Sequence, residues 1–258
     1  MKKAIAVISF GTSYDTGKKA IEYIESYISD KFKEYDCFRA FTSGMIMKKL
    51  KKEQGIVIPT TEELLQQLKE EGYEEVICQP THIIHGMEFD KMMDQIRKFQ
   101  GCFQSLKVGM PLLNEEKDYR QCVELYKKEI KIHEKEALVL MGHGSEHYAN
   151  SAYCQMEKMF EVEGIENVYV GTVEGFPTFM DIMTQIKKKD YNKIILSPFM
   201  IVAGDHAYND MIGEDEDSWK SQFEQEGYET EIYIKGMGEY EEIAKIFEEH
   251  IRKAVELS

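Results

Sequence analysis

Short apolar runs rich in β-branched residues alternate with amphipathic segments along almost the whole chain, a pattern that few folds accommodate. The runs are AIAVIS (4–9), EVIC (75–78), LKVGM (106–110), ALVLM (137–141), VYVGTV (168–173), KIILS (193–197) and EIYIKG (231–236). Between the first two runs there are two helical patterns. Ile21, Ile24 and Ile28 recur at helical spacing, and Thr60 with Glu63 forms a capping-box pattern. Strands that alternate with helices form parallel sheets with helices on both faces. The sequence therefore predicts an α/β fold.

The two halves of the chain resemble each other segment by segment. The matching pairs, in order, are VISFGTS (7–13) with LMGHGS (140–145), AFTSG (40–44) with GTVEG (171–175), QPTHIIHGME (79–88) with SPFMIVAGDH (197–206), and VGMP (108–111) with KGMG (235–238). We therefore expect two similar lobes, each a parallel sheet flanked by helices, with a cleft between them. The boundary falls in the charged stretch 126–136, giving lobes 1–128 and 129–258. The last helix, from about Glu239, could return and pack on the first lobe.

Composition excludes several classes of protein. A net charge of −15 without a basic stripe argues against nucleic-acid binding. No apolar run approaches the ~20 residues of a membrane span. The apolar stretch after Lys2 and Lys3 is too short for a signal peptide, so we expect a cytoplasmic protein. The five scattered cysteines form no CxxC pair and are expected to be reduced thiols.

Three side chains that can bind metals come directly after three predicted strands of the second half. His143 stands between two glycines in GHG, Glu174 follows VGTV, and His206 lies in VAGDHAYND, where Asp205 or Asp210 could orient its ring. Ligands of open α/β sheets bind at the carboxyl ends of strands. Imidazole and carboxylate together suit Co²⁺, Fe²⁺, Ni²⁺ or Zn²⁺. Taken singly, each residue also has a simpler interpretation as a strand cap, a helix cap or a polar loop residue.

The first half offers matching positions with different chemistry. Glu88 corresponds to His206 in the alignment of the halves. The loop SFGTS ends the first strand and consists of Ser9, Phe10, Gly11, Thr12 and Ser13. Its N–H groups and hydroxyls suit a carboxylate or phosphate, although an ordinary helix N-cap is an equal alternative. Because the loop is neither GxGxxG nor a P-loop, we expect no nucleotide cofactor.

Several segments together resemble one family almost end to end. They are MKKAIAVISFGTSY, FRAFTSGMI, THIIHGMEFDK, MGHGSEH, TVEGFP and VAGDHAYNDM. The chain resembles the anaerobic-type sirohydrochlorin cobaltochelatases of cobalamin biosynthesis, the CbiK family of class II chelatases. That resemblance implies a two-lobed chelatase fold. It also implies ATP-independent insertion of Co²⁺, as a substrate metal, into sirohydrochlorin to give cobalt-sirohydrochlorin.

The resemblance also implies roles for individual residues. His143 matches the family's essential histidine, a metal ligand and proton acceptor. Glu174 and His206 match its other metal ligands, with Glu174 also catalytic, and Glu88 matches an acidic residue of the substrate cleft. Sirohydrochlorin is a polycarboxylate whereas this chain is acidic, so we expect the amides of loop 9–13 and Arg39 to bind its carboxylates.

Two alternatives remain at this point. One is a ferrochelatase-like enzyme that inserts Fe²⁺ or Ni²⁺ into a tetrapyrrole, because the same ligands hold several divalent ions. The other is a non-catalytic protein that binds haem or metal. The sequence leaves the oligomeric state open, and it assigns no role to His85 or Phe89.

Overall fold

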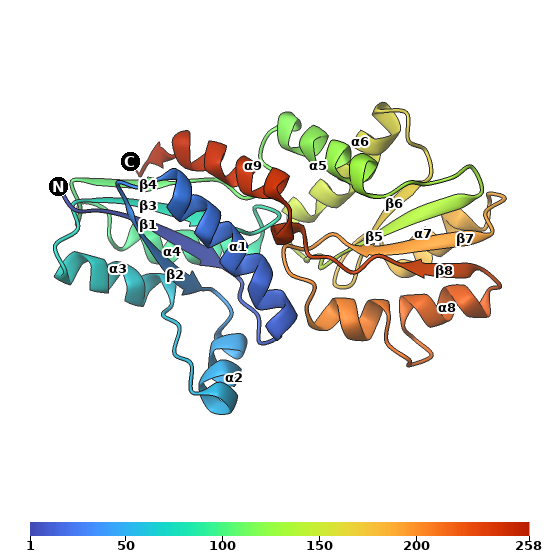
Figure 1. Cartoon of the computed structure of the whole chain (residues 1–258), viewed down its shortest axis with the longest axis horizontal. Helices are drawn as coiled ribbons and strands as arrows, with labels where there is room; N and C mark the ends of the chain where they lie inside the picture. The colour runs from blue at the N-terminus through green and yellow to red at the C-terminus, as the bar shows by residue number, and fades with distance from the viewer. Residues whose placement is uncertain (258) are drawn as a thin grey trace. The chain divides into compact units, whose positions relative to one another are not determined.

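The computed structural model describes residues 1–257 and divides into two compact units, each built on its own sheet (Figure 1). The first unit comprises Met1–Asn114 and the chain from Gly238 onward, and the second comprises Glu115–Met237. The predicted α/β fold is confirmed, since both sheets are parallel in their main strands and flanked by helices.

The first unit contains a five-stranded sheet in the order β2-β1-β3-β4-β9. Its strands are β1 (Lys3–Ser9), β2 (Asp36–Phe41), β3 (Glu75–Pro80), β4 (Ser105–Val108) and β9 (Val255–Glu256). Its helices are α1 (Asp15–Lys31), α2 (Gly44–Gln54), α3 (Thr61–Glu70), α4 (Met87–Arg97) and α9 (Glu241–Arg252). Only the short β9 is antiparallel, and it pairs with β4.

The core of this unit follows from the alternation of side chains along β1. Ala4, Ala6 and Ile8 face one side, where Leu65 of α3 and Met92 of α4 pack against them. The other side is covered by α1 and α9, which contact each other as well as β2 and β3 respectively. A strand buried on both faces must be apolar throughout, as AIAVI is.

The second unit contains a four-stranded parallel sheet in the order β6-β5-β7-β8. Its strands are β5 (Glu136–Gly142), β6 (Val168–Thr172), β7 (Lys193–Pro198) and β8 (Glu229–Ile232). Its helices are α5 (Glu116–Glu129), α6 (Ser151–Val162), α7 (Phe179–Ile186) and α8 (Trp219–Gln225), with a 3-10 turn at Tyr148–Asn150 and a π-turn at Ala207–Met211. A further 3-10 turn, Met237–Glu239, spans the boundary between the units. Phe179, Trp219 and Phe223 stack into the core beside the sheet.

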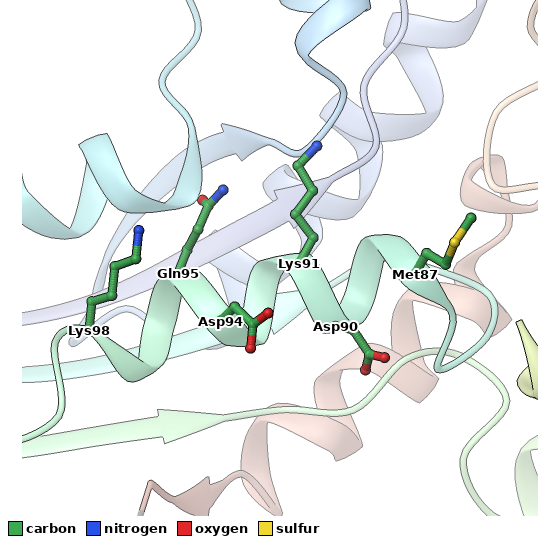
Figure 2. Close-up of a pocket in the computed structure, with 6 residues that line it drawn as sticks. All are labelled: Met87, Asp90, Lys91, Asp94, Gln95 and Lys98. Carbon is green, nitrogen blue, oxygen red and sulfur yellow. The ribbon is translucent and has the colours of Figure 1, made fainter.

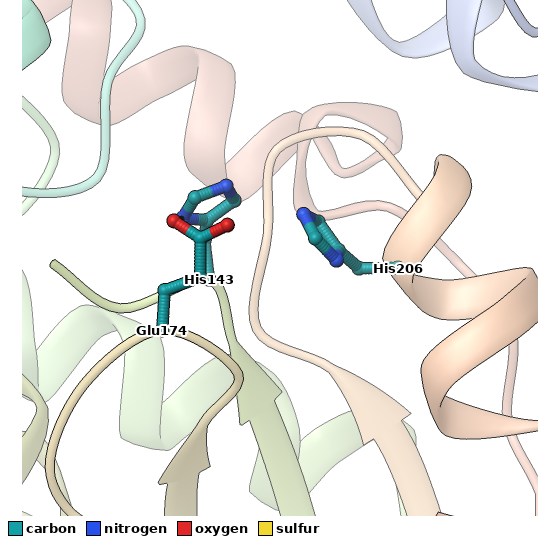
Figure 3. Close-up of side chains that lie close together, drawn as sticks. All are labelled: His143, Glu174 and His206. Carbon is teal, nitrogen blue, oxygen red and sulfur yellow. Dashed lines mark ion pairs between the residues drawn. The ribbon is translucent and has the colours of Figure 1, made fainter. Parts of the chain in front are cut away.

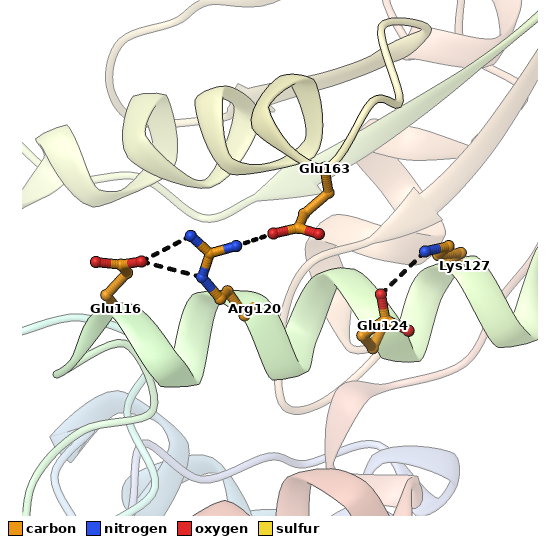
Figure 4. Close-up of polar contacts among 5 residues, drawn as sticks. All are labelled: Glu116, Arg120, Glu124, Lys127 and Glu163. Carbon is orange, nitrogen blue, oxygen red and sulfur yellow. Dashed lines mark hydrogen bonds and ion pairs between the residues drawn. The ribbon is translucent and has the colours of Figure 1, made fainter.

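Helix α5 belongs to the second unit, which differs from the expected division after residue 128. It contacts α6, and Arg120 forms an ion pair with Glu116 of its own helix and another with Glu163 at the end of α6 (Figure 4). The units therefore divide at Asn114, before α5 begins. Charge density alone indicated the later boundary, whereas packing of α5 on α6 sets the earlier one.

The predicted strands correspond to β1 and to β3 through β8. Strand β2 was not among them, because Asp36 and Arg39 interrupt its apolar pattern. The run EIYIKG is displaced from the observed strand, since β8 ends at Ile232. Within residues 1–257, no helix is both long enough and apolar enough to cross a lipid bilayer.

Equivalent backbone hydrogen bonds relate the two units. The N–H of Ser43 donates to Phe10 O at 3.2 Å, and the N–H of Glu174 donates to His143 O at 2.8 Å. Gly86 and Gly204 each accept a bond from the N–H four residues later. The first three segment matches between the halves therefore reflect equivalent positions in two similar folds.

The fourth match is displaced. The alignment of VGMP with KGMG would place Met110 opposite Met237. In the structure, Leu112 N–H donates to His82 O, whereas Met237 N–H donates to Met200 O. Because His82 and Met200 are equivalent in the third match, Leu112 is the counterpart of Met237. The glycines of the two segments do not occupy the same turn.

Candidate metal centre

Close approach of two loops explains why His143 stands between glycines. Strand β5 ends at Gly142, and the chain turns at Gly144 with φ of +85°. A Cβ atom on Gly144 would lie 2.8 Å from the backbone nitrogen of Gly175. Glycine is therefore required for both its backbone conformation and the space it leaves. The loops after β5 and β6 can then run side by side.

Glu174 is held beside His143 by this pairing of loops. The N–H of Val173 donates to Gly142 O at 3.1 Å, and the N–H of Glu174 donates to His143 O at 2.8 Å. These bonds continue the ladder between β5 and β6 past the ends of both strands. His143 Nδ1 consequently lies 3.8 Å from Glu174 Oε2.

His206 arrives from the loop after β7, where it precedes the π-turn Ala207–Met211. Its Nδ1 lies 2.6 Å from Asp210 Oδ2. Asp205, the other carboxylate that could orient this ring, instead accepts a hydrogen bond from Asn209 Nδ2 at 3.0 Å. The rings of His143 and His206 meet nearly at right angles, with centroids 4.7 Å apart.

The three side chains can share one ion. One ligand atom from each of His143, Glu174 and His206 lies within 4.8 Å of the others (Figure 3). Metal bonds of about 2.1 Å would place donors no more than about 4.2 Å apart, so small side-chain rotations suffice. The side chains remain 38%, 59% and 28% exposed, respectively. Two nitrogens and one carboxylate leave further coordination positions open.

Hydrogen bonding also selects which imidazole nitrogen faces a metal. His143 Nδ1 lies 2.9 Å from the carbonyl of Gly144, and His206 Nδ1 contacts Asp210. An oxygen acceptor at Nδ1 favours the tautomer with its proton there and the lone pair on Nε2. Both rings are thereby suited to bind a metal through Nε2.

The loop 9–13 lies in the first unit, and part of its polar chemistry is used internally. Ser9 Oγ accepts a hydrogen bond from Thr81 Oγ1 at 2.8 Å, and Thr12 Oγ1 accepts one from Tyr14 N–H at 3.1 Å. Gly11 has φ of +102°. The N-cap of α1 is Tyr14, so the serines and the threonine of the loop do not cap this helix. The expected binding of an anion by Ser9, Phe10, Gly11, Thr12 and Ser13 stays a prediction.

Arg39 lies within β2 and is engaged by α1. Its Nε and Nη2 donate to the two carboxylate oxygens of Glu25 at 2.7 and 2.5 Å. This bidentate pair raises the pKa of Arg39. A substrate carboxylate would have to compete with Glu25, which the sequence pattern did not indicate. Binding of substrate by Arg39 therefore stays a prediction, made less favourable by this ion pair.

Glu88 lies in the first turn of α4, outside the candidate metal group that residues 1–257 bring together. Its Oε2 is buried with no hydrogen-bond partner in the described part of the chain, and it lies 3.7 Å from Lys91 Nζ. On the preceding loop, His85 Nε2 lies 3.0 Å from Asn114 Oδ1, and its ring packs edge-on against Phe89 at 4.9 Å.

A surface hollow of about 430 Å³ runs along α4 in the first unit. Figure 2 shows its lining, which is Met87, Asp90, Lys91, Asp94, Gln95 and Lys98. Acidic and basic side chains alternate there, and all six lining residues belong to the first unit, whereas His143, Glu174 and His206 belong to the second.

Comparison with known families gives one match over nearly the whole chain. A family model described as cobalt chelatase (CbiK) matches residues 3–256. A sirohydrochlorin cobaltochelatase from Salmonella typhimurium is 37% identical over 260 residues, covering 100% of this chain and 98% of that protein. The sirohydrochlorin cobaltochelatase CbiKC of Nitratidesulfovibrio vulgaris is 29% identical, covering 98% and 91%.

Solved structures show the same fold at low sequence identity. SirB from Bacillus subtilis with Fe³⁺ has a TM-score of 0.67 and 13% identity, covering 98% of this chain and 95% of that one. CbiX, the terminal enzyme of siroheme biosynthesis in denitrifying bacteria, has a TM-score of 0.56 and 13% identity, covering 98% and 99%. The arrangement of strands and helices is therefore shared with these two proteins.

Proposed function

This chain belongs to the cobalt chelatase (CbiK) family, and we propose that it inserts Co²⁺ into sirohydrochlorin with His143, Glu174 and His206 holding the incoming ion. The observation that carries the residue assignment is the convergence of three ligand atoms within 4.8 Å from three different strand ends. The choice of Co²⁺ and sirohydrochlorin follows the relatives, since the ligand set alone would also hold Fe²⁺ or Ni²⁺.

Ligand exchange drives the proposed reaction. A partly exposed ion held by three protein ligands keeps open positions, so ring nitrogens can replace its waters one after another. As each bond to the ring forms, a bond to Glu174 or an imidazole can break. The protein therefore needs to bind the ion firmly enough to position it and loosely enough to release it.

Proton transfer must accompany this exchange. The two pyrrole N–H groups of the ring lose their protons as the nitrogens bind the ion, which keeps the product neutral at its centre. Imidazole and carboxylate groups released by the metal are bases that can accept these protons. We assign this role first to His143, with Glu174 beside it at 3.8 Å. No step of the scheme consumes a nucleotide.

The test compares His143→Ala with His133→Ala, an exposed histidine of the same unit that lies outside the metal centre. Protein, Co²⁺ and excess sirohydrochlorin are mixed, and the visible spectrum is monitored over many equivalents. We expect His143→Ala to lower kcat at least about 100-fold while still binding sirohydrochlorin, because a ligand and proton acceptor is lost.

The His133→Ala protein should turn over at the wild-type rate. Near-normal turnover by His143→Ala would remove the residue from the mechanism. Wild-type protein that binds one equivalent and then stops would instead be the metal- or haem-binding protein that the sequence left as an alternative.

A further inference from the structure

Helix α2 carries an unusual solvent-facing stripe. The helix buries only Leu50, and Figure 1 shows it extending away from the sheet of its own unit. Met45, Lys48, Lys49 and Lys52 are all exposed and have the spacing i, i+3, i+4, i+7. This spacing places all four on one helical face. We call these four residues the α2 stripe.

The positive charge of the stripe is not neutralised locally. Among residues 1–257, no carboxylate lies within ion-pair distance of its three lysines, although Lys49 Nζ lies 5.6 Å from the ring centre of Tyr14. Lysines of other helices commonly have a carboxylate one turn away, as Lys127 has in Glu124. In a chain with a net charge of −15, three unpaired lysines on one face form a distinct local field.

The stripe begins at the edge of the sheet where other strand-end segments meet. Ser43, the N-cap of α2, donates its N–H to Phe10 O at 3.2 Å. Lys91 Nζ of α4 donates to Thr42 O at 2.6 Å. These two hydrogen bonds join the loop after β1 and helix α4 to the segment 42–43, where α2 starts.

Each of these three segments also presents an exposed apolar side chain. The exposed fractions are 39% for Phe10, 78% for Met45 and 57% for Met87. Single exposed apolar residues are common on protein surfaces. Here they occur on three segments that hydrogen bonds join, and the lysines extend from one of them.

We propose that Phe10, Met45 and Met87 contact the face of the acidic macrocycle while Lys48, Lys49 and Lys52 bind its peripheral carboxylates. The proposal rests on the proposed function, since it takes the polycarboxylate tetrapyrrole as the occupant. Charge complementarity supports that occupant, because a flat apolar ring edged with carboxylates matches apolar side chains beside a row of ammonium groups. The stripe would also attract a polyanion to an otherwise acidic protein within the Debye length of about 8 Å at physiological salt.

The experiment measures binding of metal-free sirohydrochlorin by absorbance titration without Co²⁺. The variant is Lys48→Gln/Lys49→Gln/Lys52→Gln. Its control is Lys131→Gln/Lys188→Gln/Lys189→Gln, which removes three exposed lysines of the second unit and changes the net charge equally. We expect the α2 variant to raise Kd on the order of tenfold and the control less than about twofold, since exposed ion pairs are individually weak.

Salt provides a second readout. Raising the ionic strength should weaken binding to wild-type protein more than binding to the α2 variant, because the variant has lost the screened contacts. Met45→Gln should raise Kd at both salt concentrations, because it removes an apolar contact. Circular dichroism checks that each variant retains its fold.

The outcomes separate the two proposals. If wild-type protein binds and metallates sirohydrochlorin but the α2 variant and the control have equal Kd, the docking surface is wrong and the proposed function stands. If wild-type protein neither binds sirohydrochlorin nor inserts Co²⁺ into it, both proposals fail.

Discussion

At the scale of single residues, the contact between His206 and Asp210 links local geometry to metal binding. The 2.6 Å separation of Nδ1 and Oδ2 fixes the ring's orientation and favours Nε2 as the metal-binding nitrogen. Asp205 directly precedes His206 in the sequence, but its carboxylate accepts a hydrogen bond from Asn209. The two carboxylates therefore provide a matched pair for an experiment.

We predict that Asp210→Ala weakens Co²⁺ binding about 10- to 100-fold, because the ring of His206 loses the partner that orients it. Asp210→Asn should weaken Co²⁺ binding less, since an amide oxygen can still accept the hydrogen bond from the ring. Calorimetric titration with Co²⁺ in the absence of tetrapyrrole measures the effect directly. Asp205→Ala is the control, and equal losses in the two alanine variants would contradict a specific orienting role for Asp210.

His82 is a histidine outside the candidate metal group of residues 1–257, and its burial affects stability. Its Nε2 lies 3.3 Å from Thr42 Oγ1, and its Nδ1 is buried with no partner among residues 1–257. Burial and then the charge of Lys91 lower the pKa of His82 from 6.5 to about 4. The unfolded chain therefore binds more protons than the native state between these two pH values.

This depressed pKa predicts a pH-dependent contribution to stability. The contribution is fully present above pH 6.5 and is lost as the pH falls toward 4. Between pH 7 and pH 5, wild-type protein should lose on the order of 1 to 2 kcal/mol more unfolding free energy than His82→Gln, whose amide does not titrate. Urea denaturation at both pH values measures it. The exposed His133→Gln variant should behave as wild type, and identical pH dependence in all three proteins would exclude His82 as a source.

At the scale of secondary-structure elements, the candidate metal centre is built from the loops that leave three parallel strands. Parallel strands end at the same edge of a sheet, so β5, β6 and β7 bring their loops together. Gly144 allows the first two loops to pair closely, and the π-turn after His206 places Asp210 against its ring. The strands supply proximity, whereas the irregular turns supply orientation.

The equivalent strand ends of the first unit carry side chains of different chemistry from those of the second unit. Phe10 and Ser43 occupy the positions of His143 and Glu174, as the equivalent hydrogen bonds show. Two of the three candidate ligands are thus replaced by an aromatic ring and a hydroxyl, whereas the position of His206 carries the carboxylate of Glu88. The proposed function therefore places the incoming ion on the second unit.

At the scale of the whole molecule, the C-terminal segment returns to the first unit. Ile243, Phe247 and Ile251 of α9 are buried, and α9 contacts α1. His250 Nδ1 also lies 3.0 Å from Met110 O. The last helix in the sequence is therefore part of the core of the first unit.

We predict that Phe247→Ala lowers the unfolding free energy by about 3 to 5 kcal/mol, because a fully buried ring is replaced by a cavity. Hydrogen exchange should report faster opening of amides in β1 and β3 of the first unit. Amides in β5 and β7 should change less, because α9 belongs to the first unit. Val255→Ala, at a 58% exposed position, is the control. Equal acceleration in both sheets would contradict this assignment of α9.

Local patterns were sufficient to predict the α/β fold, most of the strands and the three side chains that the second unit brings together. An apolar run bounded by glycine identifies a strand end within a few residues of sequence, and parallel topology then brings such ends together. His143, Glu174 and His206 could be selected for this reason alone, without knowing any distance between them.

Contacts between distant segments decided the rest. Helix α5 belongs to the second unit because it packs on α6. The charge pattern around α5 does not indicate which helix it packs against. Glu25 of α1 pairs with Arg39 of β2, two elements that periodicity does not connect. The π-turn places Asp210, and not Asp205, against the ring of His206. Periodicity reports which face of a segment is buried. It does not report what is buried against that face, and ion pairs, domain limits and ring orientations all depend on that partner.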